Sequence, residues 1–207
     1  VDTLHGLNAL PEVFLLMSSL SVMGPGDETG CKPFDDASVP MPNTRYGVSK
    51  LKAETYLQQV EGMPYTIFRC TGVYGPRERD YFLMIKSIKR GVDFGVGYRR
   101  QLLTFIYVKD LAVAVMDALE RGALRRAYYI SEPRSYTQAE FRQLVCRLLG
   151  KRWVLPVRCP LWGLRAICAV GERYGRWRGK AVTLNSDKYH LLAQRNWQCD
   201  ISAARRD

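Results

Sequence analysis

The segment VFLLMSS, residues 13–19, decides the fold of this chain. Its apolar residues follow one another without alternating with polar ones, as in a strand that is buried on both faces of a parallel sheet. A second such run, YTIFRC at residues 65–70, follows a stretch with helical spacing of apolar positions at residues 45–60. Strand, helix and strand in this order predict an α/β fold with an open, mainly parallel sheet wrapped by helices.

The same alternation continues along the chain as far as Gly150. The further expected elements are strands at residues 103–108 and 128–130 and helices at residues 81–89, 109–119 and 137–149. Beyond Gly150 the pattern becomes helical and basic, which indicates a smaller lobe. We therefore divide the chain into residues 1–150, which form the sheet and carry interleaved lobe segments, and residues 151–207, a small basic lobe.

Composition places the chain among ordinary globular proteins. Of its 207 residues 47% are hydrophobic, and no apolar stretch reaches the roughly 20 residues that a membrane-spanning helix needs. The six cysteines form no C-x-x-C pair and no secretory signal opens the sequence, so we expect reduced thiols and a cytoplasmic location. Two histidines cannot supply a multi-histidine metal site, and no metal is expected. The net charge of +11 predicts a solvated basic face or an anion site, not a nucleic-acid site, because no nucleic-acid motif accompanies it.

The motif YGVSK, residues 46–50, carries the candidate chemistry. Asn43 or Thr44 can cap the helix predicted at 45–60, and Tyr46 and Lys50 then lie one turn apart on one face. A free phenol is a poor base at neutral pH, but a neighbouring ammonium favours its phenolate form. Such a pair can exchange a proton with a substrate hydroxyl or carbonyl while a nicotinamide cofactor exchanges a hydride. The alternative is an exposed helical pair without chemistry.

Three further segments accompany this motif. MSSLSVMG, residues 17–24, places serines at the end of a buried strand, where open α/β sheets bind ligands; the alternative is a turn whose hydroxyls bond their own backbone. RCTGVYGPR, residues 69–77, leaves the next strand at the same edge, or is an ordinary Gly-Pro turn. FIYVKD, residues 105–110, runs from a strand into a helix, where Asp110 can be a simple N-terminal carboxylate.

In this order and spacing, the four segments resemble the extended short-chain dehydrogenase/reductase family, which includes NAD-dependent sugar epimerases and dehydratases. The resemblance extends from Thr3 to Asp200 and leans toward the 3β-hydroxysteroid dehydrogenase and dihydroflavonol reductase branch. It implies a Rossmann-like, doubly wound sheet whose first strands are missing from this sequence, with residues 151–207 as a mostly helical substrate lobe. It also implies an NAD(P)-dependent epimerase, dehydratase or hydroxy/keto oxidoreductase that uses NAD or NADP, with NAD preferred.

The resemblance assigns roles to individual residues. Ser19, five residues before Gly24, is implied to hydrogen-bond the reacting substrate oxygen. Tyr46 is implied to be the acid and base, and Lys50 to favour its phenolate and bind the nicotinamide ribose. The implied cofactor-binding residues are Tyr46, Lys50 and Ser18, with Thr71, Gly72 and Val73 as a wall against the nicotinamide carboxamide. The candidate substrate contacts are Ser19, Arg77, Arg79, Tyr98 and Arg99. Tyr107 and Asp110 match an architectural motif between the lobes.

The sequence departs from the family pattern in two respects. The glycine-rich phosphate loop is absent, so we expect that the N-terminal part of a complete member is missing, that the C-terminal end stops early, and that this fragment is inactive by itself. Leu103 stands where members that use nucleotide sugars commonly carry arginine, which favours a less charged sugar or another hydroxy or keto compound. A non-catalytic protein that binds small molecules or nucleotides is the alternative. The helix of Tyr46 and Lys50 is the candidate homodimer interface.

The stretch PLWGLRAICAVGERYGRWR, residues 160–178, allows two interpretations. An amphipathic helix of this composition can lie on an anionic membrane surface. It can also cover the substrate cleft with its apolar face turned inward. We favour this second arrangement, so no membrane contact is expected.

Overall fold

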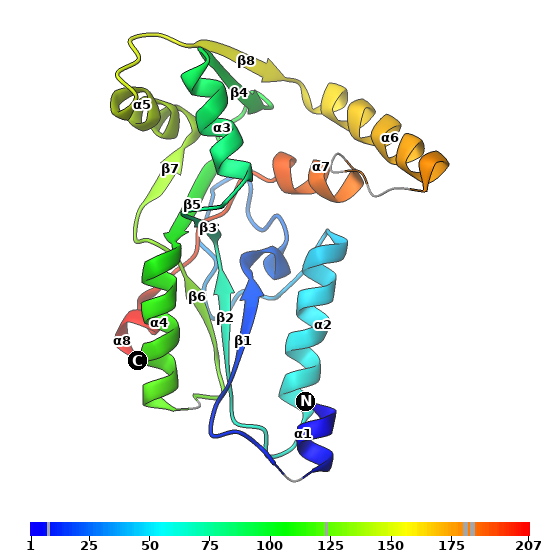
Figure 1. Cartoon of the computed structure of the whole chain (residues 1–207), viewed down its shortest axis with the longest axis vertical. Helices are drawn as coiled ribbons and strands as arrows, with labels where there is room; N and C mark the ends of the chain where they lie inside the picture. Colours follow the sequence, from blue (N-terminus) through cyan, green and yellow to red (C-terminus); the bar gives the residue numbers. More distant parts are fainter. Residues whose placement is uncertain (8, 123, 180–181, 183–184) are drawn as a thin grey trace.

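The structure of the chain is a computed structural model that describes residues 1–7, 9–122, 124–179, 182 and 185–207. Its central layer is a three-stranded parallel sheet with the strand order β1-β2-β6, covered by helix α2 on one face and helix α4 on the other (Figure 1). These elements are β1 Phe14–Ser19, α2 Arg45–Gln59, β2 Tyr65–Cys70, α4 Val108–Arg121 and β6 Ala127–Ile130. The predicted α/β fold with a mainly parallel sheet wrapped by helices is confirmed.

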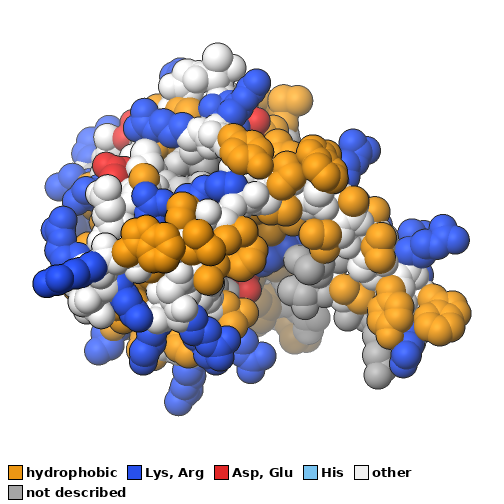
Figure 2. Space-filling view, turned by 90° about the horizontal axis from the view of Figure 1, so that it is seen from above, with side chains coloured by type: hydrophobic (Ala, Val, Ile, Leu, Met, Phe, Trp, Pro, Cys, Tyr) orange, Lys and Arg blue, Asp and Glu red, His pale blue; other side chains and the backbone are white. Residues whose placement is uncertain are grey.

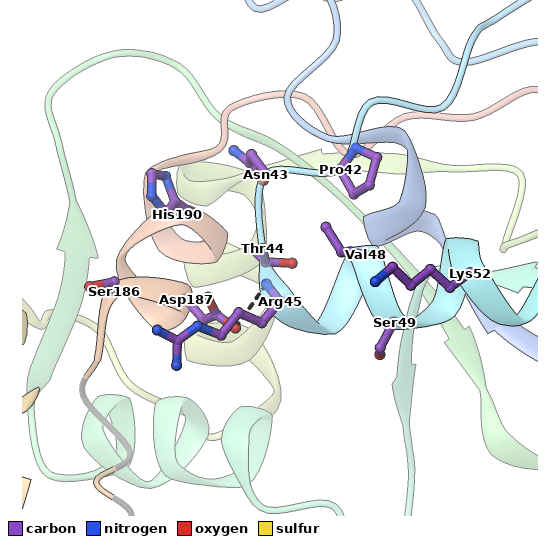
Figure 3. Close-up of a pocket in the computed structure, with 10 residues that line it drawn as sticks. All are labelled: Pro42, Asn43, Thr44, Arg45, Val48, Ser49, Lys52, Ser186, Asp187 and His190. Carbon is purple, nitrogen blue, oxygen red and sulfur yellow. Dashed lines mark hydrogen bonds between the residues drawn. The ribbon is translucent and has the colours of Figure 1, made fainter. Parts of the chain in front are cut away.

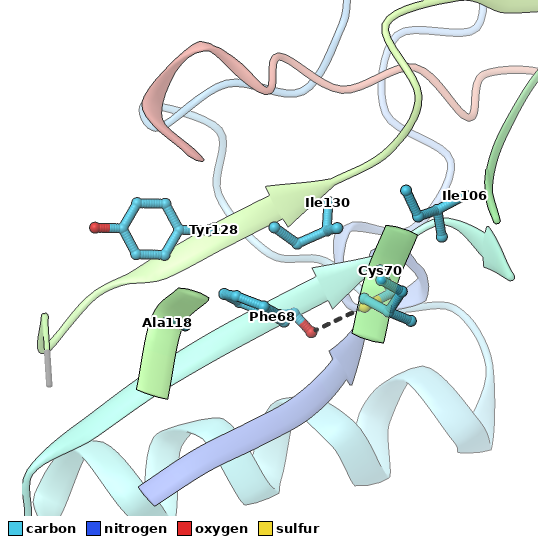
Figure 4. Close-up of a cluster of buried hydrophobic side chains, with 7 residues drawn as sticks. Phe68, Cys70, Ile106, Ala118, Tyr128 and Ile130 are labelled. Atoms are coloured by element: carbon cyan, nitrogen blue, oxygen red, sulfur yellow. Dashed lines mark hydrogen bonds between the residues drawn. The ribbon is translucent and has the colours of Figure 1, made fainter. Parts of the chain in front are cut away.

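Both faces of β2 are buried, which explains why its sequence does not alternate. Ile67 packs with Leu57 of α2 on one face of the sheet. Its neighbour Phe68 packs with Leu111 of α4 and Tyr128 of β6 on the other face, the side drawn in Figure 4. Successive side chains of a strand point to opposite faces, so a strand that is covered on both sides buries consecutive residues, which in β2 are mostly apolar.

The start of α2 is fixed by a cap and by a close backbone approach. The Thr44 hydroxyl accepts a hydrogen bond of 2.9 Å from the Gly47 amide, as expected for a helix N-cap. Gly47 itself faces the backbone of Ser21, and a β-carbon there would clash with the Ser21 carbonyl oxygen. Glycine at this position therefore allows the first turn of α2 to touch the segment that follows β1.

Two smaller sheets lie beyond the carboxyl ends of β1 and β2 (Figure 1). In one of them β5 pairs in parallel with β3 and antiparallel with β7; in the other β4 pairs in parallel with β8. Ile88 of α3, Val145 of α5 and Val154 form a small apolar cluster beside the second sheet. The elements are β3 Gly72–Tyr74, α3 Asp80–Lys89, β4 Val92–Val96, β5 Leu102–Tyr107, β7 Ser135–Thr137, α5 Gln138–Leu148 and β8 Leu155–Cys159.

The C-terminal segment first leaves the body of the molecule and then returns to it. Helix α6 projects to one side with α7 against it (Figure 1). After α7 the chain runs back along the molecule, with β-bridges from Asn196 to Leu102 and from Cys199 to Phe34. The remaining elements are α1 Asp2–Gly6, the 3-10 helix η1 Leu20–Met23, α6 Leu161–Arg178, α7 Ser186–Ala193 and α8 Ser202–Arg206.

Some features of the structure differ from the sequence-based expectation. The segment expected as a loop after β2 contains strand β3, and the strands β4, β7 and β8 were not predicted. Gly95 in β4 and Pro156 in β8 interrupt the patterns by which strands are recognised. In α6, which was expected to turn its apolar face inward, Leu164 and Cys168 are buried but Trp177 is exposed. None of the helices in the described part of the chain has the length and apolar character to cross a bilayer.

Candidate active site

The candidate site lies at the carboxyl ends of β1 and β2. The two strands are parallel and in register, with Ser19 opposite Cys70, so the chain leaves both strands at the same edge of the sheet. Thr71 follows directly after β2, and the sequence-predicted serine and threonine are thereby brought to one edge. Open α/β sheets bind their ligands at this edge.

Tyr46 and Lys50 lie on one face of α2, beside the end of β1. The Lys50 ammonium donates a hydrogen bond of 2.9 Å to the carbonyl oxygen of Met17, and its nitrogen lies 5.8 Å from the centre of the Tyr46 ring. Tyr46 is 47% exposed. An ammonium has three donors, and among the described residues Lys50 uses one of them. The pair is therefore open to a ligand at this edge.

Ser19 joins β1 to η1 and lies close to the start of α2. Its hydroxyl accepts a hydrogen bond of 3.2 Å from the Ser21 amide and donates one of 3.1 Å to the Ser21 hydroxyl. The Ser19 hydroxyl therefore forms the local turn that was the alternative to ligand binding. Its oxygen still has a second lone pair that a ligand can use. Because Ser21 touches Gly47 of α2, Ser19 and Tyr46 belong to two segments in direct contact.

A buried polar network beneath the site links α2 to both strands. Glu54 is 1% exposed, and its carboxylate accepts hydrogen bonds from the Ser18 hydroxyl of β1 and from the Arg69 guanidinium of β2. The ion pair between Arg69 Nη2 and Glu54 Oε2 spans 2.7 Å. Arg69 also donates to the Tyr129 hydroxyl of β6 at 3.4 Å. The network ties the helix of Tyr46 to the strands that carry the other site residues.

The Glu54 carboxylate controls the electrostatics of this network. Burial acts to lower the pKa of the Arg69 guanidinium, but the hydrogen bond and charge of Glu54 outweigh it and the pKa is raised. Sequence reasoning missed this pair, although Glu54 lies four residues after Lys50 and eight after Tyr46, which places all three on one helical face. The Ser18 hydroxyl, implied by the resemblance to bind cofactor, is engaged with Glu54.

The segment expected as a wall against the nicotinamide is largely held by the protein itself. Thr71 is buried, and its amide and hydroxyl both donate to the Ile130 carbonyl oxygen, at 3.1 and 3.3 Å. Gly72 pairs with β5 and lies against the Tyr81 hydroxyl, which leaves no room for a β-carbon. Val73 packs into the apolar cluster on the α4 side of the sheet. The position of this segment beside β1 is therefore rigidly defined.

The remaining candidate substrate contacts divide into two groups. Tyr98 and Arg99 line a cavity of about 330 Å³, together with Trp162 of α6 and with Arg195. Arg77 and Arg79 lie on the exposed segment between β3 and α3 and do not line this cavity. The structure thus brings the first pair together and separates it from the second. Sequence reasoning missed Trp162 and Arg195, because their approach to Tyr98 depends on how the C-terminal segment folds back.

A larger cavity, of about 530 Å³, lies between the start of α2 and α7 (Figure 3). From α2 it is lined by Arg45, Val48, Ser49 and Lys52, which form a stripe next to the face of Tyr46 and Lys50. The Arg45 amide donates a hydrogen bond of 3.0 Å to the Asp187 carboxylate across this cavity. The α2 residues along this cavity do not include Tyr46 or Lys50, so the cavity borders the predicted site without containing it.

Thiol and metal chemistry find little support at this edge. Burial raises the pKa of the Cys70 thiol to about 12, against the opposing effect of the Lys50 charge, so this thiol is protonated at neutral pH. Within the described ranges, no group of three or more histidine, cysteine, aspartate or glutamate side chains could hold a metal ion. The arrangement is suited to proton transfer by a phenol with an adjacent ammonium and a serine hydroxyl.

Comparison with known proteins points in the same direction. A family model described as the NAD dependent epimerase/dehydratase family matches residues 4–131. No curated protein matches the chain.

Epimerases and dehydratases are among the solved structures that this chain resembles. A dTDP-glucose 4,6-dehydratase from Streptomyces venezuelae with NAD bound shares 17% identity over 98% of this chain and 55% of its own, with a TM-score of 0.70. A UDP-glucose 4-epimerase from Thermotoga maritima with UDP-glucose shares 20% identity over 97% of this chain and 58% of its own, with a TM-score of 0.69. A UDP-glucuronic acid 4-epimerase from Bacillus cereus with NAD and UDP-glucuronic acid shares 20% identity over 94% of this chain and 55% of its own, with a TM-score of 0.67. At these identities the likeness shows the fold, and the chain spans little more than half the length of these structures.

Proposed function

The chain belongs to the NAD-dependent epimerase/dehydratase family, and from this we propose that it forms the catalytic side of a nicotinamide-dependent epimerase, dehydratase or oxidoreductase. The observation that carries the proposal is the position of Tyr46 and Lys50 at the ligand-binding edge of the sheet, next to the segment that begins with Ser19. A phenol, an ammonium and a hydroxyl are the groups that proton transfer to a substrate oxygen requires.

The donors at this edge fit a nicotinamide dinucleotide. Ribose hydroxyls accept hydrogen bonds, and among the described residues the Lys50 ammonium uses only one of its three donors, in the bond to Met17. Tyr46 is exposed beside it and can share the same ribose. When bound, the cofactor supplies the hydride acceptor and donor of the reaction. NAD is favoured over NADP because the dehydratase and one epimerase among the similar structures hold NAD.

Three side chains of this chain would handle the proton. Tyr46 takes a proton from, or returns it to, the substrate oxygen at which the carbonyl forms. Lys50 stabilises the negative charge of the phenolate, since an opposite charge nearby favours the ionised form. Ser19 hydrogen-bonds the same oxygen through its remaining lone pair or, after rotation away from Ser21, through its proton.

The substrate is proposed to be a small sugar or another hydroxy or keto compound. Two of the similar structures hold nucleotide sugars. Leu103, which replaces the arginine common in nucleotide-sugar enzymes, favours a less charged compound here. Tyr98 and Arg99, together with Trp162 in the same cavity, are the proposed substrate contacts because they offer a guanidinium beside two exposed aromatic rings.

The test is the substitution Tyr46→Phe in the protein that contains this chain. Loss of the phenolic hydroxyl is expected to lower turnover by about 10²- to 10⁴-fold while cofactor binding changes little. Tyr56→Phe is the matched control, because Tyr56 lies on the same helix and is 44% exposed, close to the 47% of Tyr46. Turnover is measured through the absorbance of the reduced nicotinamide or, for an internal redox cycle, through product formation.

Two outcomes would count against this assignment. Near-normal turnover of the Tyr46→Phe protein would show that the phenol takes no part in the reaction. Undetectable turnover of the unaltered protein with any sugar or keto substrate, together with tight nicotinamide binding, would favour the alternative of a non-catalytic binding protein.

A further inference from the structure

Helix α6 is attached to the rest of the molecule by one face. Leu164 and Cys168, four residues apart, are both buried, and Gly175 continues the same stripe near the end of the helix. Helix α6 packs against α7 and otherwise projects from the body of the protein (Figure 1). The other apolar residues of α6 lie outside this inner stripe.

Four exposed apolar residues form a second stripe on α6, which we call the outer arc. It consists of Ile167, Val170, Tyr174 and Trp177, whose spacing of three to four residues puts them on one helical face. All four are exposed, Val170 by 69% and Trp177 by 77%. In Figure 2 hydrophobic side chains follow this projecting arm to its end. A contiguous exposed apolar stripe of this kind marks an interaction site.

Arginines border the outer arc on both sides. Arg173 lies three residues after Val170 and four before Trp177, and therefore beside both on the helix. The Arg178 guanidinium lies 5.3 Å from the ring centre of Tyr174 and 5.6 Å from that of Trp177. Among the described residues neither arginine forms an ion pair. The border of the outer arc is thus cationic.

Negative charge is kept away from this face. The only acidic residue of α6 is Glu172. Its carboxylate accepts a hydrogen bond of 2.5 Å from the Ser186 hydroxyl at the start of α7 and lies 4.0 Å from Arg45. It is therefore directed toward the body of the protein. The outward surface combines apolar and aromatic residues with positive charge only.

We propose that the outer arc binds the surface of an anionic lipid bilayer. Val170 and Ile167 would enter the acyl boundary, and Tyr174 and Trp177 would occupy the headgroup region that aromatic side chains prefer. Arg173 would meet lipid phosphates, and the net charge of +11 adds a general attraction to an anionic surface. Helix α6 projects from the body of the molecule, which suits contact with a flat bilayer (Figure 1). The exposure of the outer arc thus favours the membrane arrangement over burial in the cleft.

The test is flotation of the full chain with vesicles made of equal parts phosphatidylglycerol and phosphatidylcholine, and with vesicles of phosphatidylcholine alone. The unaltered chain is expected to float with the anionic vesicles. The double substitution Val170→Ser with Trp177→Ser should weaken this binding by about tenfold or more, because it removes two large apolar side chains from the contact. Trp153→Ser is the matched control, since Trp153 is 71% exposed but lies outside α6, and it should leave binding unchanged.

The charge contribution is tested separately. The double substitution Arg173→Gln with Arg178→Gln should reduce binding to the anionic vesicles and leave the weak binding to phosphatidylcholine unchanged. The control substitution Arg147→Gln in α5 should leave binding to both kinds of vesicle unchanged. Circular dichroism of each variant checks that the fold is kept.

The proposal would be overturned if the unaltered chain stayed unbound, or if the Val170 and Trp177 variant floated as well as the unaltered chain. Concentration-dependent self-association that this variant abolishes, without vesicle binding, would assign the outer arc to a second copy of the chain. None of these readouts depends on enzymatic activity, so they are independent of the proposed function.

Discussion

The buried ion pair beneath the candidate site gives the sharpest prediction for stability. Glu54→Gln replaces a carboxylate by an amide of nearly the same size, so it removes charge without opening a cavity. Glu54 and Arg69 have side chains that are only 1% and 13% exposed, and the variant leaves the guanidinium of Arg69 buried without a counter-charge. Breaking such a pair costs about 3–5 kcal/mol of the free energy of unfolding. The Ser18 hydroxyl keeps an acceptor in the amide oxygen, so the loss is expected to come mainly from the ion pair.

Urea unfolding followed by circular dichroism measures this loss. With a slope of about 2 kcal/mol per M, the midpoint should fall by about 1.5–2.5 M. Glu61→Gln is the control, because Glu61 is exposed and the change should stay within about 0.5 kcal/mol. The double variant Glu54→Leu with Arg69→Met removes both charges and should be markedly more stable than Glu54→Gln alone, since neither charge is left unpaired.

This reasoning would be refuted by a loss below about 1 kcal/mol in Glu54→Gln, which is what an exposed ion pair gives. It would also be refuted by a double variant that is no more stable than Glu54→Gln, because removing both charges must relieve the penalty of an unpaired buried charge.

The other predictions concern the helix of the site and a cap remote from it. Lys50→Met should weaken nicotinamide dinucleotide binding, measured by calorimetry, by about tenfold or more, since it removes charge-assisted donors to the ribose; unchanged affinity would contradict the ribose contact. Gly47→Ala should destabilise the protein by about 1–3 kcal/mol in urea and reduce turnover, because the added methyl group clashes with the Ser21 carbonyl oxygen; stabilisation, the usual effect of alanine in a helix, would show that the close approach is absent. Thr137→Ala should cost about 1 kcal/mol through loss of the capping box of α5 and leave turnover unchanged; a drop in turnover would contradict the view that this cap serves stability alone.

The parts of the fold that depend on local pattern could be predicted from the sequence. Strand β2 lacks an alternating pattern because helices cover both of its faces, and α2 begins at the predicted cap Thr44. Strand β1 was also predicted to be buried on both faces, but it lies at the edge of the sheet, is only partly buried and exposes Met17. Strands β4 and β8 escaped prediction for a physical reason. Each is short, contains a residue that weakens strands, and pairs with a partner about 60 residues away, so its stability arises from tertiary contact.

In the candidate site, too, the features set by local sequence pattern could be predicted and those set by tertiary contact could not. The helical period alone brings Tyr46 and Lys50 together, and the strand end explains the position of Ser19. The ion pair of Glu54 with Arg69 could not be read from either residue, because its partners lie on a helix and a strand whose packing decides the contact. The orientation of α6 could not be predicted either, because apolar residues lie on more than one side of this helix and tertiary packing decides which of them are buried.

The central claim is that Tyr46, Lys50 and Ser19 face one nicotinamide ring, and a crystal structure of the protein that contains this chain, grown with NAD, tests it most directly. We predict that Lys50 Nζ and the Tyr46 hydroxyl will hydrogen-bond the nicotinamide ribose, and that Ser19 will lie on the side of the ring where a substrate oxygen can reach both hydroxyls. A nicotinamide bound away from this face of α2, or a Ser19 hydroxyl too far from Tyr46 to share one small ligand with it, would contradict the account.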